Sequence, residues 1–167
     1  MGSIGAFISG PKAIIKYLRY NTRSQIFAKS LPLMIVEGML KRMEMVKTMP
    51  HLRSKLWENV AKLQSGLKAR GFDIGNTNSP VTPIFMKGDV PEATQMVMDL
   101  RENYHIFCSI VVYPVIPKGD IIYRLIPTAV HTEDDIEITL NAFEATKKKL
   151  DAGEYKAVDI PDMAEKD

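Results

Sequence analysis

The sequence predicts an α+β fold, in which helices pack on a small antiparallel or mixed sheet. Three observations lead to this prediction. Apolar residues recur every three or four positions through residues 31–71, which is typical of long amphipathic helices. Short β-branched runs at 81–86, 106–112 and 121–126 indicate strands. From residue 81 the order is strand, helix, strand, strand, helix, and this order favours one sheet with helices packed on it.

Composition limits the class of protein. The chain has 167 residues, 46% hydrophobic and 25% charged, which is enough to bury a core. Its net charge is +2 and it lacks a basic stripe with interleaved aromatic residues, so nucleic-acid binding is not indicated. No apolar segment reaches the roughly 18 residues of a membrane helix. The single cysteine, Cys108, rules out an internal disulfide and favours a cytoplasmic location.

The first 50 residues are expected to form a glycine-interrupted strand and then two helices. The strand would end at Gly10, and Pro11 suits the first turn of a helix. Residues 21–29 show no clear periodicity and are interpreted as a connection. A second helix is expected to begin at Leu31-Pro32.

A third helix is expected from Pro50 to about Gly71, because leucine and valine recur on one face and glycine is a common helix stop. Residues 81–86 form a strand candidate, and Pro83 within it indicates an edge or a bulge. A fourth helix begins at 89–91.

The region from 106 to the end completes the predicted sheet. A nearly continuous apolar strand covers 106–112, and the prolines in 113–117 predict a stiff, extended loop. The next strand is 121–126. Thr132 and Asp135 have the spacing of a capping box for the last helix. From Ala152 onward the chain is polar and expected to be loose.

Arg124 is the one charged residue of strand 121–126. We expect both faces of this strand to be covered, and an unpaired guanidinium there would be costly. Arg124 therefore needs an anionic partner or a route to water. Its planar fork suits a carboxylate held by two hydrogen bonds. The residues alone leave two interpretations open, a structural arginine and a ligand-binding arginine.

The usual catalytic templates are missing from the sequence. His51, His105, His131 and Cys108 do not have metal-ligand spacing, so no metal site is expected. There is no GxSxG, P-loop or GxGxxG motif. A ligand-binding or regulatory module that holds an anionic effector through Arg124 therefore fits the residues as well as an enzyme does.

Several stretches of the chain together form a recognisable pattern. They are Gly5-Ala6-Phe7, Tyr17-Leu18-Arg19, Ile26-Phe27-Ala28-Lys29-Ser30-Leu31-Pro32, Tyr113-Pro114-Val115-Ile116-Pro117-Lys118-Gly119, Arg124, and Ala129-Val130-His131-Thr132. In this order they resemble the α-oxoamine synthases, pyridoxal-phosphate acyltransferases of the aspartate-aminotransferase fold type (fold type I). The resemblance covers about residues 1 to 150 and implies that the α+β domain is the C-terminal domain of that fold.

The resemblance implies a function and a division of the chain. The parent enzyme would be a cytoplasmic homodimer that uses pyridoxal 5'-phosphate to condense glycine, alanine or serine with an acyl-CoA, releasing CoA and usually carbon dioxide. Residues 1–48 would end the large cofactor domain and its connecting helix, 49–152 would form the small domain, and 153–167 a polar tail. The Schiff-base lysine would lie two positions before Met1, so this chain alone is expected to be inactive.

The resemblance also assigns site residues. Arg124 matches the family arginine that binds the substrate α-carboxylate, and Tyr113 lies in a segment that would line the substrate and acyl-chain entrance. Residues 27–30 match the segment that reaches the cofactor phosphate of the neighbouring subunit. Ala28, Lys29 and Ser30 are thus the cofactor-binding candidates, although the family usually has hydroxyl or amide residues at the first two positions. A third possibility is an interaction fragment whose two long helices bury a dimer surface.

Overall fold

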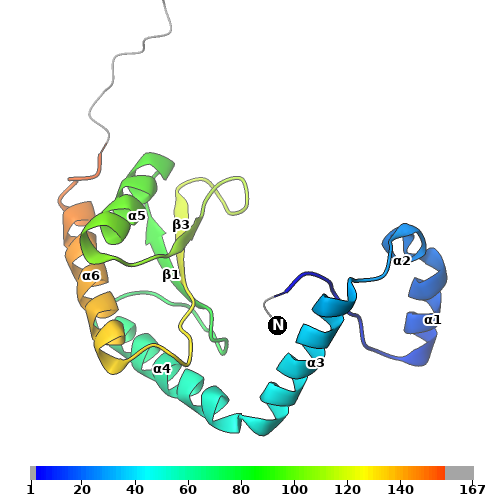
Figure 1. Cartoon of the computed structure of the whole chain (residues 1–167). Helices are drawn as coiled ribbons and strands as arrows, with labels where there is room; N and C mark the ends of the chain where they lie inside the picture. The colour runs from blue at the N-terminus through cyan, green and yellow to red at the C-terminus, as the bar shows by residue number, and fades with distance from the viewer. Residues whose placement is uncertain (1–2, 157–167) are drawn as a thin grey trace, which may run out of the picture. The chain divides into compact units, whose positions relative to one another are not determined.

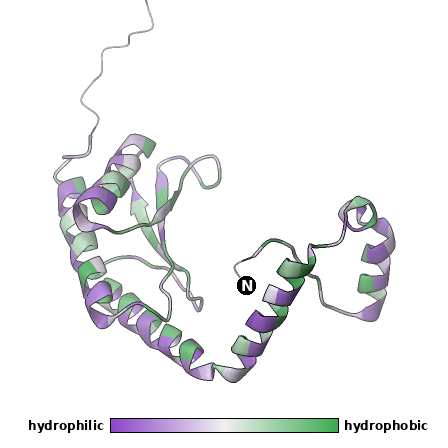
Figure 2. Ribbon diagram, in the orientation of Figure 1, coloured by the Kyte–Doolittle hydropathy of each residue, from purple (hydrophilic) through white to green (hydrophobic). Residues whose placement is uncertain are grey.

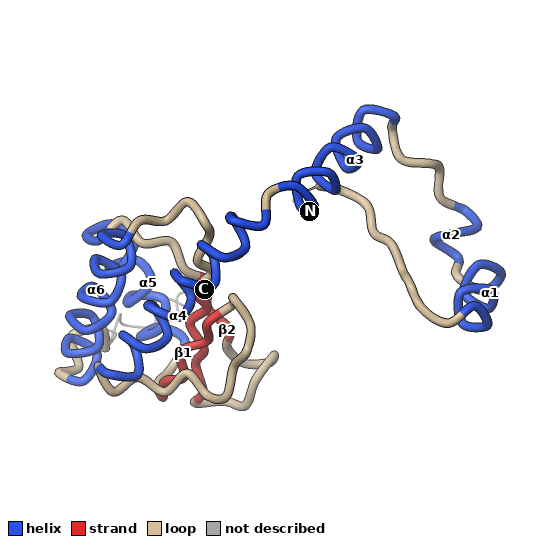
Figure 3. Tube along the Cα trace, turned by 90° about the horizontal axis from the view of Figure 1, so that it is seen from below, coloured by secondary structure: helices blue, strands red, loops and turns tan. Residues whose placement is uncertain are grey.

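The structure is a computed structural model that describes residues 3–156. The chain divides into two compact units, Met1–Pro50 and His51–Asp167, called here the N-terminal unit and the C-terminal unit. Figure 1 labels their helices and the strands β1 and β3, and Figure 3 also labels β2. In residues 3–156, no helix is long and apolar enough to cross a membrane.

The N-terminal unit consists of α1 (Lys12–Asn21), α2 (Arg23–Phe27) and α3 (Leu33–Thr48). The prediction of a strand before Gly10 is wrong, because residues 3–10 are irregular. The sheet of the described chain contains only β1, β2 and β3, so this segment has no partner strand. The connection expected at 21–29 is also partly wrong, since α2 lies within it. None of residues 3–50 is buried, and apolar side chains of α1 and α3 are exposed. Figure 2 colours the ribbon by hydropathy and shows apolar positions along both helices in green.

The C-terminal unit carries the sheet. Its strands β1 (Thr82–Lys87), β2 (Ser109–Val111) and β3 (Asp120–Leu125) pair antiparallel in the order β1-β3-β2. Its helices are α4 (Pro50–Ala69), α5 (Val90–Tyr104) and α6 (Glu133–Asp151), and they lie on one side of the sheet in both views (Figures 1 and 3). This arrangement confirms the predicted α+β class.

The core lies between the sheet and the helices. On β3 the residues Ile121, Tyr123 and Leu125 are buried, as expected from the two-residue period of a strand with one covered face. The ring of Tyr123 meets the edge of Phe143 from α6 at 6.1 Å between centroids. The alternate residues Ile122 and Arg124 therefore face the other side. The expectation that both faces of this strand are covered is wrong for the described residues.

Local sequence signals explain how the elements end. The capping box predicted at Thr132 and Asp135 is confirmed, and Asp89 with Glu92 forms a second box at the start of α5. His105 ends α5 in the left-handed conformation, with φ of 58°. Tyr155 is buried, so the chain is not loose as far as that residue. The remainder of the predicted tail, from 157, lies outside the described residues.

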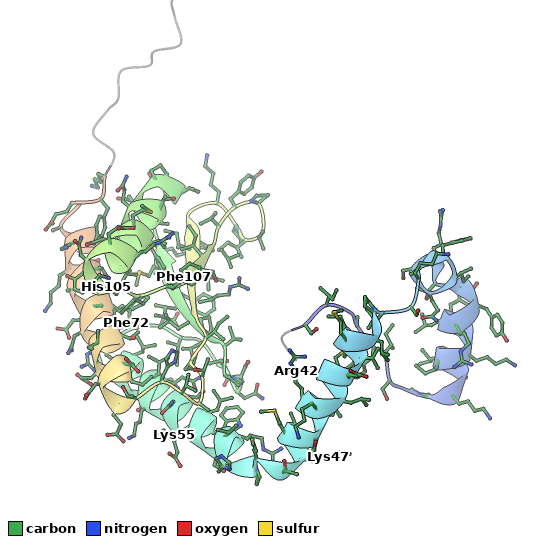
Figure 4. The ribbon with its side chains drawn as sticks, viewed as in Figure 1. Arg42, Lys47, Lys55, Phe72, His105 and Phe107 are labelled. Carbon is green, nitrogen blue, oxygen red and sulfur yellow. The ribbon has the colours of Figure 1, made fainter. Side chains whose placement is uncertain are left out.

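The chain between α5 and β3 differs from its prediction in two ways. Residues 106–108 alternate between buried and exposed but do not pair with another strand, so β2 is shorter than the predicted strand 106–112. Within this segment the side chain of Phe107 is 84% exposed, and Figure 4 labels it together with His105. The loop predicted to be extended is instead a tight turn. The N–H of Val115 donates to the carbonyl of Val112 at 3.0 Å around the cis Tyr113-Pro114 bond, which is the arrangement of a type VI turn.

Candidate functional site

Arg124 lies on the central strand, on the sheet face that carries no helix of the C-terminal unit. It pairs with Pro83 of β1 on one side and with Ser109 of β2 on the other. The side chain is exposed, and its Nε donates a hydrogen bond to Ser109 Oγ at 3.1 Å. Among residues 3–156, no carboxylate oxygen lies within the 4.0 Å of an ion pair with this guanidinium. The positive charge is therefore available to a ligand.

The neighbours of Arg124 on this face are mostly apolar. One step along the sheet, Phe85, Ile122 and Val111 stand in register across the three strands. At the end of the strands, Lys87 and Asp120 form an ion pair with each other, so this carboxylate is already neutralised. We call Pro83, Phe85, Ser109, Val111, Ile122 and Arg124 the open sheet face. It offers one free cation beside an apolar surface, which suits a ligand with an anionic end.

Tyr113 lies at a different part of the sheet from Arg124. Arg124 pairs with Ser109, and Tyr113 follows Ser109 by four residues, up to about 13 Å of extended chain. Its side chain is 62% exposed at the turn after β2. Arg124 is thus paired at the first residue of β2 and Tyr113 follows its last residue by two positions, so the two residues lie toward different ends of this strand.

The three cofactor candidates lie together in the N-terminal unit. Ala28, Lys29 and Ser30 are exposed in the segment between α2 and α3, and they line a cleft of about 830 Å³. Arg19 also lines this cleft, together with the hydroxyl residues Thr22 and Ser24. Of the described residues that line it, none is acidic. Two cations and several hydroxyl donors without a carboxylate form a donor set that fits a phosphate group.

Arg19 was not a site candidate from its position alone. The signal that could have found it is its place in the stretch Tyr17-Leu18-Arg19, which is part of the family resemblance. α1 carries Arg19 in its last turn, two positions before the helix ends at Asn21. α1 and the segment 28–30 thus bring Arg19 and Lys29, ten residues apart in the sequence, to the same cleft.

Two further polar clusters form hydrogen bonds within the fold. Fully buried Asn59 donates from Nδ2 to the carbonyls of Thr128 and His131, at 2.9 and 2.8 Å, and His131 Nδ1 accepts from the N–H of Thr128 at 3.1 Å. These bonds hold the loop before α6. They give His131 a structural role in the described chain. Asn59 has no motif or periodic pattern that would identify it from the sequence.

The second cluster joins α5, α6 and Tyr155. Asp99 accepts hydrogen bonds from Lys149 Nζ at 2.7 Å, from Asn103 Nδ2 at 2.6 Å and from the Tyr155 hydroxyl. Burial raises the pKa of Asp99, but these hydrogen bonds and the positive charge of Lys149 outweigh it and hold the pKa below its ordinary value. The carboxylate is thus occupied within the fold.

Cys108 is not a nucleophile candidate. It is buried, and burial raises the pKa of its thiol to about 11, which keeps the thiol protonated at neutral pH. In the described part of the chain, no three of the histidine, cysteine, aspartate and glutamate side chains are grouped to hold a metal ion.

Comparison with known proteins assigns the family. A family model for class I and II aminotransferases matches residues 1–153. The chain is 60% identical over 158 residues to a cysteate-C-fatty acyltransferase of Capnocytophaga ochracea, and 34% identical over 149 residues to an 8-amino-7-oxononanoate synthase of Petrotoga mobilis. The matches cover 95% and 89% of this chain, but 38% and 37% of those relatives. The chain belongs to the class I and II aminotransferase family and, within it, to the α-oxoamine synthases.

A solved structure supports the same assignment. A serine palmitoyltransferase with its pyridoxal-phosphate internal aldimine superposes with a TM-score of 0.79 and 26% sequence identity, over 90% of this chain and 38% of that one. The prediction that the fold is part of the fold type I architecture is confirmed. The chain thus spans a little over a third of the length of the relatives it matches.

Proposed function

We propose that this chain is the C-terminal part of a pyridoxal-phosphate-dependent acyltransferase that condenses a small amino acid with an acyl-CoA. The observation that carries the proposal is Arg124, an arginine without a carboxylate partner among the described residues, on the open sheet face of an α-oxoamine synthase fold. The relative of 60% identity, which is a cysteate-C-fatty acyltransferase, adds cysteate to glycine, alanine and serine as amino acids to test.

Arg124 would bind the α-carboxylate of the amino acid. A guanidinium with free Nη groups can donate two parallel hydrogen bonds to one carboxylate, which fixes both its position and its orientation. This orients the bonds at Cα before the reaction and removes part of the entropic cost of reaching the transition state. The apolar residues beside Arg124 exclude water once this face is covered, and a fixed charge acts more strongly in such surroundings.

The N-terminal unit would bind the cofactor phosphate. Lys29, Ser30 and Arg19 are the donors around the cleft between α1 and the segment 28–30, and no acidic residue of the described chain opposes them there. Pyridoxal phosphate, when bound, supplies an electron-withdrawing ring that stabilises negative charge at the amino-acid Cα. We place the Schiff-base lysine in the part of the protein before this chain, and we propose a homodimer in which this unit serves the neighbouring subunit.

The N-terminal unit supports the proposal that the chain belongs to a longer protein. None of residues 3–50 is buried, although they include large apolar side chains such as Phe7, Phe27 and Leu33 at 71% exposure or more. A soluble protein rarely exposes such continuous apolar surface without a partner. The cofactor domain and a second subunit would supply the covering surface.

The test is an assay of CoA release by the protein that contains this chain together with the preceding cofactor domain. The holoprotein is incubated with an acyl-CoA and glycine, alanine, serine or cysteate in turn. We expect CoA release with one of these amino acids, and none from residues 1–167 alone. A holoprotein that binds pyridoxal phosphate but releases no CoA with any of them would overturn the proposal and favour a module that only binds an anion.

A further inference from the structure

We infer that Ser109 is a positioning residue for amino-acid binding. Its hydroxyl holds Nε of Arg124, so that the two terminal nitrogens, Nη1 and Nη2, are the ones left to meet the substrate carboxylate. The inference rests on the proposed function, because it describes how Arg124 binds the amino acid.

The backbone fixes the pair before any ligand arrives. Ser109 and Arg124 are directly opposite on β2 and β3, and the next pair, Ile110 and Tyr123, holds the register because Tyr123 is fully buried. A slip of one residue would turn Tyr123 out of the core. Side chains of opposite residues in an antiparallel pair lie on the same face and close together, and the 3.1 Å bond between Nε and Oγ follows from that placement.

The hydrogen bond selects one of two ways in which arginine can hold a carboxylate. A guanidinium presents five N–H donors, and a carboxylate can bind either across Nε and one Nη or across both Nη atoms. With Nε donated to Ser109, the arrangement across both Nη atoms remains. On the other side of Arg124 stands Pro83, which has no backbone N–H and no polar side chain to compete for the carboxylate.

A neutral acceptor orients the guanidinium without cancelling its charge. Arg70 shows the contrasting case, since its Nη2 lies 2.6 Å from Glu137 Oε1 and its Nε lies 3.4 Å from Glu144 Oε2. Arg70 is therefore occupied by protein carboxylates on α6, whereas Ser109 leaves the charge of Arg124 for a ligand. Holding a long, flexible side chain in place beforehand also lowers the entropic cost of binding.

Three substitutions at position 109 test the inference in the full-length holoprotein. Ser109→Ala removes the acceptor, Ser109→Thr keeps a hydroxyl on a residue that suits a strand, and Ser109→Asp adds a carboxylate that occupies Arg124. The dissociation constant of the amino acid is measured without acyl-CoA, so that catalysis does not enter it. The KM for acyl-CoA and the melting temperature are measured for each variant.

We expect Ser109→Ala to raise the dissociation constant of the amino acid roughly threefold to tenfold, the usual effect of one hydrogen bond, with little change in the acyl-CoA KM or the melting temperature. Ser109→Thr should bind the amino acid about as tightly as the wild type does, because it keeps the hydroxyl. Ser109→Asp raises the dissociation constant by more than about tenfold while the melting temperature stays equal or rises, because the new ion pair stabilises the fold and blocks the ligand. A residue with only a structural role would not separate affinity from stability in this way.

The controls separate this inference from the proposed function. If Arg124→Ala weakens amino-acid binding and Ser109→Ala does not, the inference about Ser109 is wrong and the function of Arg124 stands. If neither substitution changes the dissociation constant, both fail. A crystal structure of the holoprotein with the amino acid gives an independent reading: a carboxylate on Nη1 and Nη2 supports the inference, and a carboxylate on Nε with Ser109 displaced overturns it.

Discussion

At the scale of single residues, the neighbours of a cation decide whether it stabilises the fold or binds a ligand. Lys149 donates to the nearly buried carboxylate of Asp99, which has 9% of its side chain exposed, and the pair ties α5 to α6. Arg124 has a serine hydroxyl as its neighbour, in the part of the chain that the structure describes. A serine hydroxyl orients the guanidinium and leaves its charge unpaired, so Arg124 can bind the carboxylate of a ligand.

Asp99→Asn should make the stability of the protein less sensitive to acid. Because the pKa of Asp99 is lower in the folded protein than its ordinary value of about 4, its stabilising contribution is present above that value and is lost as the pH falls through the lowered pKa. We expect the variant to be about 1–2 kcal/mol less stable near pH 7. The difference from wild type should shrink as the pH falls below about 4 and the carboxylate of the wild type becomes protonated.

Urea unfolding at several pH values measures this prediction, with Glu102→Gln as the control. Glu102 is exposed on the same helix, so its substitution should change the free energy of unfolding by less than about 0.5 kcal/mol. A constant difference between wild type and Asp99→Asn at all pH values would contradict the assigned hydrogen bonds.

The sequence singled out Arg124 but not its partners. A lone charge in a β-branched run is visible without a structure, because its spacing relative to the apolar residues shows that it lies on the strand. Ser109, Asn59 and Asp99 were missed, since their roles depend on the register of β2 with β3 and on contacts over 15 to 72 residues of sequence. A serine or asparagine has no periodic sequence pattern from which its hydrogen-bond partner could be predicted.

At the scale of elements, α4 and α6 approach each other closely at Gly66. A Cβ built at this position would overlap Leu140 Cδ1 and lie 3.0 Å from its Cδ2. Leu140 is buried in the core, which leaves its side chain little room to move. The absence of a side chain at position 66 therefore allows the two helices to pack at this distance.

Gly66→Ala should destabilise the C-terminal unit even though alanine is the better helix former. Helix propensity favours the substitution by about 1 kcal/mol, and overpacking a core costs about 1–3 kcal/mol. We expect a net decrease in the free energy of unfolding of about 1 kcal/mol, measured by urea denaturation. Ser65→Ala, one position away on the exposed side of α4, is the matched control and should be neutral or slightly stabilising. Equal or greater stability for Gly66→Ala would contradict the helix packing.

Long helices were the most predictable elements, because their apolar periodicity extends over many turns. Short extended segments were less predictable. Residues 4–9 have strand-like composition but no partner, and 106–108 are extended without pairing, so β2 begins at Ser109. The tight turn at 113–115 includes a cis proline, and the sequence does not distinguish this bond from the trans form that predicts an extended loop. Strand pairing and peptide isomers depend on the tertiary structure.

At the scale of the whole molecule, the two units differ in the buried core that stabilises them. The C-terminal unit has a continuous core of buried residues from α4, α5, α6 and the sheet. The N-terminal unit has no buried residue between positions 3 and 50. Burial of apolar surface is the main stabilising term of folding, so the N-terminal unit needs a surface outside itself to become stable.

Amide hydrogen exchange should show this difference directly. In residues 1–167 alone, we expect amides of α4, α5 and α6 to be protected and those of α1 and α3 to exchange orders of magnitude faster. In the protein that includes the cofactor domain, α1 and α3 should gain protection. Equal protection of both units in the isolated chain would show that the N-terminal unit is stable without a covering surface.

The central claim is that Arg124 binds the carboxylate of an amino acid, and one binding cycle tests it most directly. The dissociation constants of the amino-acid substrate and of the corresponding amine without its α-carboxylate are measured for the wild-type holoprotein and for Arg124→Ala. We predict that the substitution weakens binding of the amino acid by about 2 kcal/mol or more and leaves binding of the amine nearly unchanged. Equal effects on the two ligands, or no effect on either, would contradict the account.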